Sequence, residues 1–181
     1  MAMNLYTIGH SRHPIDKFIQ LILSHRIEVL VDVRSTPFSR FNPQFNKNAL
    51  QQALEKQHIV YIYAGEELGG RPKDPECYKQ RAIPSKPGDY LNEMDYPEVM
   101  KRPWFLNGIQ QLLDIVGKHS SAIMCSEEDP AKCHRHHLIA MHLMATHPEV
   151  KILHIRGDGN LVDAKSILNS PDKSDAEQLS F

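Results

Sequence analysis

The segment IEVLVDV, Ile27–Val33, is the part of the sequence that most narrows the choice of fold. It is rich in β-branched residues and almost continuously apolar, whereas a strand with one face in water alternates apolar and polar residues. Such a run is typical of a strand that is buried on both faces, and strands of this kind occur in parallel sheets covered by helices. We therefore expect Ile27–Val33 to be a central strand of an α/β protein.

The rest of the chain alternates between strand and helix patterns around this segment. Short β-branched runs predict four further strands at Asn4–Ile8, His58–Ala64, Ser121–Cys125 and Val150–Ile155. Helical spacing of apolar residues predicts helices at Ile15–His25, Asn46–Gln57, Pro103–His119 and Pro130–Thr146. This order indicates an open, mainly parallel sheet of about five strands flanked by helices, with right-handed crossovers.

Residues 66–103, between the third and fourth predicted strands, break this pattern. They are interrupted by prolines and glycines, and only Glu76–Arg81 and Asp95–Met100 favour short helices. A long irregular insertion in a compact domain is more often functional than accidental. Beyond the fifth strand, Asp158-Gly159 predicts a turn into a short edge strand. We expect residues 1–165 to form a single domain and the polar residues 166–181 to be a frayed tail.

The charge balance of the 181 residues limits the classes of partner. There are 21 basic and 22 acidic residues, so the formal net charge is -1 and no global field draws the chain to DNA or to an anionic membrane. Any anion must therefore be bound locally. The first residues do not resemble a secretion leader, no apolar run is long enough to span a membrane, and three cysteines are too few for a disulfide framework. These features favour a cytoplasmic protein with free thiols and no membrane partner, and they leave the oligomeric state open.

Polar residues gather where the predicted strands end. Ligands of open α/β sheets bind beyond the carboxyl ends of the strands, where loops and helix N-termini converge. The segments that follow the first four strands are GHSRH (Gly9–His13), DVRSTPFSRF (Asp32–Phe41), AGEELGGRP (Ala64–Pro72) and CSEEDP (Cys125–Pro130). The segments at the opposite ends are chemically plainer. We therefore expect a pocket at the carboxyl edge of the sheet.

Four motifs in this order and spacing resemble those of a known family. They are TIGHS (Thr7–Ser11), DVRSTPFSRFNPQF (Asp32–Phe45), LGGRP (Leu68–Pro72) and CSEEDPAKCHR (Cys125–Arg135). Together they resemble the DUF488 family, small bacterial and archaeal proteins without an assigned function, over most of the chain from Leu5 to Asp163. The resemblance implies a cytosolic α/β domain whose signature residues are these polar ones, and it implies no particular reaction.

The candidate catalytic residues combine imidazoles with carboxylates, which carry out most general acid and base catalysis. They are His10, Asp32, Glu127 and His134. His10 follows Gly9 at a strand end, so it is either an acid, base or ligand, or a histidine bonded to a loop carbonyl. Asp32 and Arg34 share one face of an extended segment. They form either a structural ion pair, or a site in which Asp32 orients His10 and Arg34 holds an anion.

The candidate substrate-binding residues are arginines, glycines and small polar residues of the same loops. Arginine forks fit phosphate and carboxylate groups, and glycines allow a ligand to approach the backbone closely. The set is Ser11, Arg34, Ser39, Arg40, Glu66, Gly69, Gly70, Arg71 and Arg135. Ser11 is equally suited to capping the following helix, and the loop phenylalanines are assigned mostly to packing. Neither a Walker loop nor a dinucleotide fingerprint is present.

The segment MCSEEDPAKCHRHH admits three interpretations. In the first, Cys125 and Cys133 bind a divalent metal together with His134 or His137. The paired Cys-x-x-Cys spacing of structural zinc sites is absent, so metal is the minority interpretation and no cofactor is assigned.

In the second interpretation, Cys125 or Cys133 is a nucleophile, and His10 or His134 takes its proton. The neighbouring carboxylates oppose this role, because negative charge raises the pKa of a thiol. In the third, which we favour, Glu127 is the catalytic carboxylate and both cysteines are packing residues.

This combination of carboxylates and arginines favours an enzyme over the other classes. We expect a hydrolase or group transferase that acts on a small phosphorylated or nucleotide-like anion. The alternative is a non-catalytic module that binds a nucleotide or nucleic acid, although the net charge of -1 disfavours a large nucleic-acid footprint. A Cys/His metal-binding protein is the second alternative.

Overall fold

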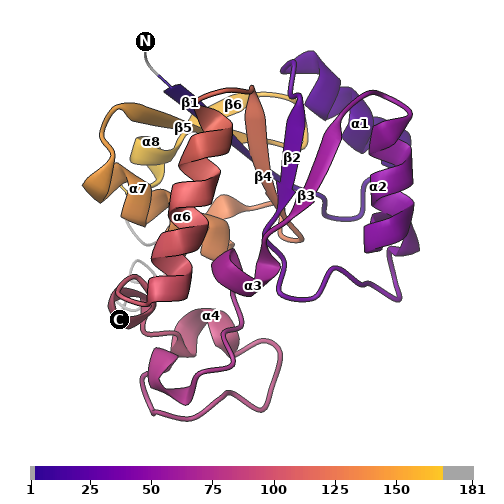
Figure 1. Cartoon of the computed structure of the whole chain (residues 1–181). Coiled ribbons are helices and arrows are strands. Elements are labelled where there is room, and N and C mark those ends of the chain that lie inside the picture. The colour runs from indigo at the N-terminus through magenta and orange to yellow at the C-terminus, as the bar shows by residue number, and fades with distance from the viewer. Residues whose placement is uncertain (1–2, 169–181) are drawn as a thin grey trace, which may run out of the picture.

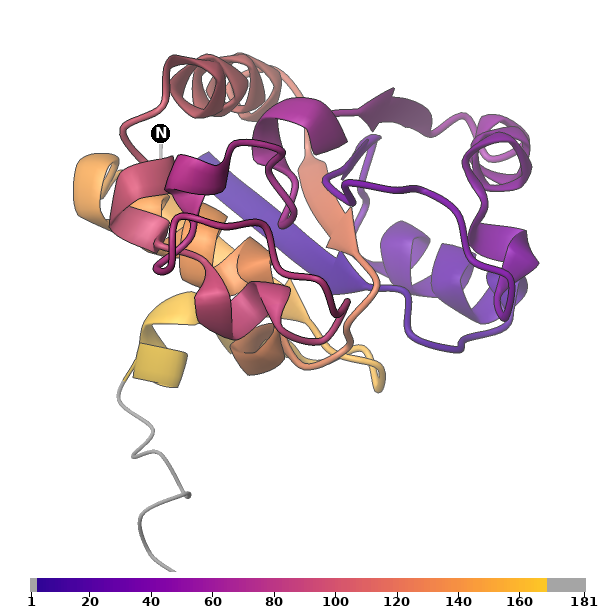
Figure 2. The ribbon, with the colours of Figure 1, turned by 90° about the horizontal axis from the view of Figure 1, so that it is seen from below.

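A six-stranded sheet runs through the protein, with helices on both of its faces (Figures 1 and 2). The computed structural model describes residues 3–168. The strands lie in the order β3-β2-β4-β1-β5-β6. Their bounds are β1 (Met3–Gly9), β2 (Val29–Asp32), β3 (Val60–Tyr63), β4 (Ser121–Cys125), β5 (Val150–Ile155) and β6 (Leu161–Asp163). The predicted fold class, a mainly parallel α/β sheet, is therefore confirmed.

The register of the sheet brings the ends of three strands together. The first five strands are parallel, and only β6 is antiparallel to its neighbour. Gly9 pairs with Cys125 across β1 and β4, and Asp32 pairs with Met124 across β2 and β4. The polar segments that follow β1, β2 and β4 consequently start side by side at one edge of the sheet.

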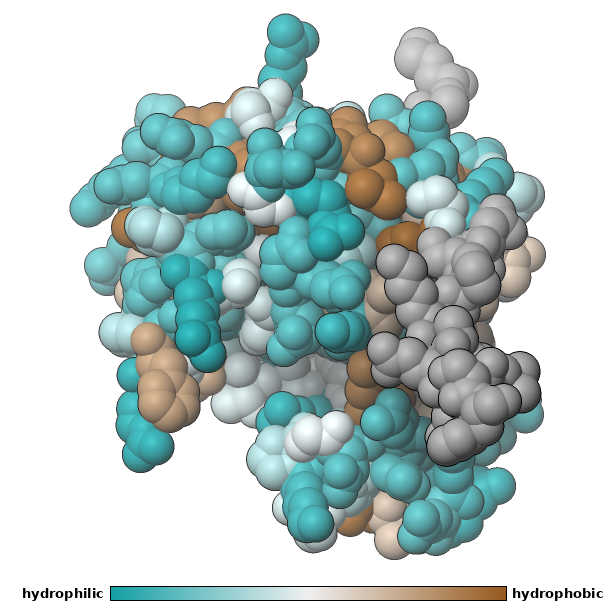
Figure 3. Space-filling view, turned by 180° about the vertical axis from the view of Figure 1, so that it is seen from behind, coloured by the Kyte–Doolittle hydropathy of each residue, from teal (hydrophilic) through white to brown (hydrophobic). Residues whose placement is uncertain are grey.

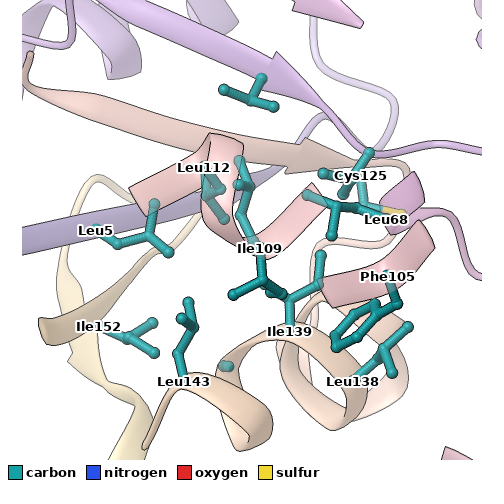
Figure 4. Packing of buried hydrophobic residues seen from close by; sticks show 14 of the residues in the cluster. Leu5, Leu68, Phe105, Ile109, Leu112, Cys125, Leu138, Ile139, Leu143 and Ile152 are labelled. Atoms are coloured by element: carbon teal, nitrogen blue, oxygen red, sulfur yellow. The ribbon is translucent and has the colours of Figure 1, made fainter. Parts of the chain in front are cut away.

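The helices divide the core into two clusters on opposite faces of the sheet. Their bounds are α1 (Ile15–Ser24), α2 (Lys47–Glu55), α3 (Gly65–Leu68), α4 (Tyr90–Glu93), α5 (Tyr96–Val99), α6 (Pro103–Val116), α7 (Met141–Thr146) and α8 (Ala164–Leu168). Helices α1 and α2 cover one face, where Phe18 and Leu50 pack with Leu30 of β2. Helix α6 and the segment leading into α7 cover the other, around Ile109 and Ile139 (Figure 4). Successive residues of β2 thus point into different cores.

The single helix predicted at Pro130–Thr146 is wrong. The chain forms a short 3-10 turn at Pro130–Lys132, a π-helical segment at Arg135–Ala140, and only then α7. The break falls at Cys133, whose backbone is extended, with φ of -139° and ψ of 138°. The Asp129 side chain caps the start of the 3-10 turn by accepting a hydrogen bond from the Ala131 amide, and the extended residue Cys133 ends the turn. The Cys133 side chain is thereby directed toward the end of β4.

The insertion forms a lobe below the carboxyl edge of the sheet (Figure 1). The helix predicted at Glu76–Arg81 is wrong, since only a 3-10 turn forms at Pro75–Cys77, whereas α5 lies within the predicted Asp95–Met100. Helices α3 and α4 were not predicted. Each is a single turn, too short to show a helical period in sequence.

The C-terminal part of the described chain follows the predicted hairpin. Gly159 has φ of +90°, a conformation that glycine adopts without strain, and it leads into the antiparallel edge strand β6. Helix α8 occupies the first residues of the predicted tail, and residues 169–181 lie outside the described residues. Within residues 3–168, none of the helices has the length and hydrophobicity needed to cross a bilayer.

Candidate functional site

A pocket of about 430 Å³ lies at the carboxyl edge of the sheet. In Figure 3 the surface is hollowed between the body of the protein and the insertion lobe. The pocket is lined by Arg34, Ser35, Thr36, Phe38, Gly70, Arg71, Pro87, Gly88, Tyr90, Leu91, Cys125, Ser126, Glu127, Lys132, Cys133 and His134. These residues come from the segments after β2, β3 and β4 and from the insertion. The predicted position of the pocket agrees with this geometry.

Two cysteines and a histidine form a buried cluster in the wall of this pocket. The Nδ1 atom of His134 lies 3.6 Å from Cys125 Sγ and 3.9 Å from Cys133 Sγ. The three side chains are 8%, 2% and 8% exposed for Cys125, Cys133 and His134. His134 Nε2 donates a hydrogen bond to the carbonyl oxygen of Val33 at 3.1 Å. Because a carbonyl oxygen only accepts, Nε2 carries a hydrogen and Nδ1 is the atom presented to the sulfurs.

The backbone around the cluster is held by close approaches that require glycine. A Cβ atom on Gly70 would lie 2.6 Å from Cγ of His134, so the Gly70 backbone packs directly against the imidazole. A Cβ atom on Gly9 would lie 1.7 Å from the carbonyl oxygen of Glu127. These two glycines allow β1 and the insertion to approach the loop after β4. The ring of His134 is consequently fixed between the insertion and the end of β2.

The two thiols differ in their acidity because their sulfur atoms lie within 4.8 Å of each other. The hydrogen bond to Cys133, together with burial, raises the pKa of Cys125 well above its usual value. Burial also opposes ionisation of Cys133, but its interactions with Cys125 and His134 lower the pKa of Cys133 well below its usual value. The pair therefore favours a state with one thiolate, on Cys133.

Three exposed charged side chains line the same pocket. Arg71 lies over the ring of Tyr90, with its guanidinium carbon 5.1 Å from the ring centre, and its backbone amide donates to Ser35 Oγ at 2.9 Å. Lys132 and Glu127 come from the loop between β4 and Cys133. Arg71 and Lys132 bring positive charge to the pocket, and Glu127 brings a carboxylate.

Asp32 and Arg34 form a buried ion pair. Asp32 is fully buried and accepts hydrogen bonds from Arg34 Nε at 2.9 Å, from Arg34 Nη2 at 2.6 Å and from the Tyr61 hydroxyl at 2.7 Å. Arg34 also donates to the carbonyl oxygen of Phe45 at 2.8 Å. Arg34 reaches the pocket wall, whereas Asp32 does not. The arrangement braces the loop between β2 and α2.

His10 belongs to the same network. Its Nδ1 atom donates to the carbonyl oxygen of Ser11 at 2.8 Å, and its Nε2 atom accepts from Arg34 at 3.3 Å. The ring stacks on Phe45 with 4.2 Å between the ring centres. Burial, followed by the charge of Arg34, lowers the pKa of His10 to about 4. At neutral pH the imidazole is therefore uncharged, and it does not line the pocket.

Arg135 is fully buried below the loop that follows β4. Its guanidinium donates to the carbonyl oxygens of Glu127 and Glu128 and to Thr7 Oγ1. Arg135 therefore holds the backbone that presents Glu127 and lies outside the pocket lining. Its guanidinium is directed at three acceptors inside the protein.

The remaining predicted residues lie beside the pocket or away from it. Glu66 and Gly69 line a neighbouring cavity of about 380 Å³, which also includes Arg71. The other candidates outside the pocket lining are Ser11, Ser39 and Arg40. Ser39 Oγ accepts from the Asn42 amide, and Arg40 lies over the ring of Phe41.

His137 is separate from the Cys125–Cys133–His134 cluster. Its Nε2 atom donates to the carbonyl oxygen of Ala131 at 2.6 Å, and its ring lies against Tyr96. Of the four potential metal ligands, the structure therefore brings together Cys125, Cys133 and His134.

Sequence reasoning did not single out Lys132 or Tyr90. Lys132 lies within the motif CSEEDPAKCHR, directly before Cys133, so the motif itself contained a cation next to a strand end. Tyr90 lies in the irregular insertion, where no periodicity or motif marked it. Ser35 and Thr36 were passed over between Arg34 and Ser39, although they follow β2 directly and line the pocket.

The comparison with protein families agrees with the motifs at this edge of the sheet. The model of the domain of unknown function DUF488 matches residues 14–142. The chain belongs to this family. The DUF488 match contains the Cys125–Cys133–His134 cluster and the whole pocket lining, and it begins after the TIGHS motif of β1. Comparisons with curated proteins and with solved structures give no significant match.

Proposed function

We propose that this DUF488 protein is an enzyme, a hydrolase or group transferase, that acts on a small phosphorylated or nucleotide-like anion. The observation that carries the proposal is one pocket that combines cations with groups able to react. Arg71 and Lys132 line it together with the cluster of Cys125, Cys133 and His134. The buried network of His10, Asp32 and Arg34 serves in this proposal to hold the loops.

The size and charge of the pocket support a small ligand. A volume of about 430 Å³ lies within the range of pockets for small molecules and cofactors. Arg71 is exposed, yet its place over Tyr90 limits the positions of its guanidinium. An arginine held in this way binds a phosphate or carboxylate with less loss of side-chain entropy than a free one. Glu127 is the acid or base for the substrate in this pocket.

Ligand binding is tested first with the double variant Arg71→Gln/Lys132→Gln. The probes are nucleoside monophosphates, sugar phosphates and inorganic phosphate, and the readout is the shift of the unfolding temperature. We expect wild-type protein to be stabilised by at least one probe and the double variant to lose about 10-fold or more in affinity, since each charge-assisted hydrogen bond contributes ~1.5 kcal/mol or more. Lys118→Gln, which removes an exposed lysine at the opposite edge of the sheet, is the matched control.

Turnover is tested with Glu127→Gln, which preserves the size of the side chain and removes its acid and base function. We expect this variant to keep ligand binding and to lose about 100-fold or more in the turnover rate. Salt-sensitive binding without turnover in wild-type protein would favour the non-catalytic binding module instead. No ligand-induced shift with any of the probes would contradict the proposal.

A further inference from the structure

The geometry points to a binding site for one zinc-type divalent cation formed by Cys125, Cys133 and His134. Among residues 3–168 they form one group of potential ligands whose donor atoms all lie within 4.8 Å of one another. The inference deepens the proposed function, since it places an ion in the wall of the same pocket, and any catalytic role of the ion rests on that proposal. Binding of the ion rests on the geometry of the three side chains.

The distances between the donor atoms fit a tetrahedral ion. With Zn–S bonds of about 2.3 Å and Zn–N bonds of about 2.0 Å, sulfur and nitrogen ligands of one zinc lie about 3.6 Å apart. The distances from His134 Nδ1 are 3.6 Å to Cys125 Sγ and 3.9 Å to Cys133 Sγ. The two distances from Nδ1 therefore match those around one tetrahedral ion to within a few tenths of an ångström.

The hydrogen bonds around the cluster are those of a metal site. Histidine ligands usually donate their second ring nitrogen to a carbonyl or carboxylate, which fixes the tautomer and the plane of the ring. His134 does so through Nε2 to Val33 O at 3.1 Å. The backbone amide of Arg135 is directed at Cys133 Sγ, 3.5 Å away, and favours the thiolate there. These contacts leave Nδ1 and the sulfur lone pairs directed at the shared space.

Charge and burial also favour an ion. A second thiolate beside Cys133 is costly in a site less than a tenth exposed unless its charge is compensated. A divalent cation cancels both charges and so allows both cysteines to bind it as thiolates. Sulfur and imidazole are the ligands that zinc prefers over the hard cations magnesium and calcium, which bind oxygen.

The coordination number identifies the kind of site. Structural zinc sites have four protein ligands, whereas catalytic sites have three and leave the fourth position to water or substrate. Here Cys125, Cys133 and His134 all line the pocket, so a fourth ligand enters from the pocket itself. An oxygen of the anion held by Arg71 and Lys132 is the expected occupant.

The decisive experiment titrates reduced, metal-free wild-type protein, without a histidine tag, with Co²⁺ and then displaces it with Zn²⁺. Thiol counting in denaturant first verifies that all three cysteines are reduced. We expect one Co²⁺ per chain, tetrahedral absorption bands, and a thiolate-to-cobalt charge-transfer band that Zn²⁺ abolishes. Absence of the charge-transfer band in wild-type protein overturns the inference, and it leaves the anion-binding assay of Arg71→Gln/Lys132→Gln unaffected.

Matched variants identify the ligands. Cys133→Ala and His134→Gln should each weaken Co²⁺ binding by about 100-fold or more, because removal of even an outer partner costs 10–100-fold. Cys77→Ala and His137→Gln, which remove a buried cysteine and a nearby histidine outside the cluster, should bind as wild type does. Circular dichroism verifies that each variant is folded. Unchanged binding by folded Cys133→Ala, or equal loss in Cys77→Ala, overturns the assignment.

Discussion

Two buried polar clusters lie on opposite faces of the sheet, and they differ in how completely their polar atoms are paired. Asp32, Arg34 and His10 lie on the side of α1 and α2, where Asp32 receives two hydrogen bonds from the Arg34 guanidinium, one from the Arg34 backbone amide and one from Tyr61. Cys125 and Cys133 lie on the side of α6 with His134, whose Nδ1 faces only weak sulfur partners. The first cluster has its bonding capacity filled by protein atoms. The second cluster keeps nitrogen and sulfur lone pairs without strong hydrogen-bond donors, and it borders the pocket.

This difference shows that burial and polarity alone do not mark a functional site. Both clusters are at strand ends and both contain ionisable groups with shifted pKa values. The closed cluster should contribute mainly to stability, because loss of one partner leaves a buried charge unpaired. The open cluster should contribute mainly to ligand binding. The following predictions test this division.

The largest effect is expected from Asp32→Ala. The substitution leaves the Arg34 guanidinium, 4% exposed, without its carboxylate, and removal of one partner of a buried ion pair costs about 3–5 kcal/mol. The free energy of unfolding, measured by urea denaturation, should fall by this amount. A loss below ~1 kcal/mol would show that the cluster is not structural.

The second largest effect is expected on the acid sensitivity of stability, through His10. Its pKa is lowered from 6.5 to about 4 in the folded protein, mainly by burial. Between pH 6.5 and 4, His10 is therefore protonated in the unfolded chain but largely neutral in the folded protein. The free energy of unfolding consequently falls as the pH falls through this window. His10→Gln should reduce the stability difference between pH 7 and pH 4 by about 3 kcal/mol in denaturation experiments.

A smaller effect is expected from Gly70→Ala. The added methyl group would lie 2.6 Å from Cγ of His134, so the ring or the insertion must move, and overpacking of this kind costs about 1–3 kcal/mol. Displacement of the ring should also weaken Co²⁺ binding. Gly88→Ala is the matched control, because a Cβ atom there meets no other atom within 4 Å. Equal Co²⁺ affinity in Gly70→Ala and wild type would contradict the proposed packing.

The smallest effect on stability is expected from Cys133→Ala in metal-free, reduced protein. The cysteine packs as a small buried side chain, and its truncation should cost about 1 kcal/mol in the free energy of unfolding. Zn²⁺ should stabilise wild-type protein and not this variant, since a ligand stabilises only the state that binds it. A loss of unfolding free energy as large as that of Asp32→Ala would contradict the proposed difference between the two clusters.

The sheet could be predicted from the sequence because its strands are short, continuous apolar runs, and burial on both faces leaves little choice of structure. Ile27–Val33 contains β2, and Ser121–Cys125 agrees with β4 at both ends. The strand ends also indicated the position of the pocket. The DUF488 resemblance agreed with the family match, although that match covers a shorter range than Leu5–Asp163.

The local geometry of the site could not be predicted in the same way. A continuous helix over Pro130–Thr146 would bring Cys133 and His137, four residues apart, onto one face, but the extended backbone at Cys133 separates these two side chains. Nothing in the residue pattern distinguishes that break from a regular helix start. Tyr90 lines the pocket because of the path that the insertion takes, and the insertion has no helical or strand periodicity from which this path could be read. Both features are set by tertiary contacts.

The π-helical segment Arg135–Ala140 has a consequence for how this site tolerates change in chain length. A π-helical turn holds more residues than an α-helical turn, so it accommodates the equivalent of an inserted residue. Deleting one residue there would restore an α-helix and rotate everything before it by about 100° relative to α7. Cys133 and His134 would then turn away from Cys125, although every side chain of the cluster would still be present. The number of residues between the cluster and α7 therefore matters for the site as much as the identity of its side chains does.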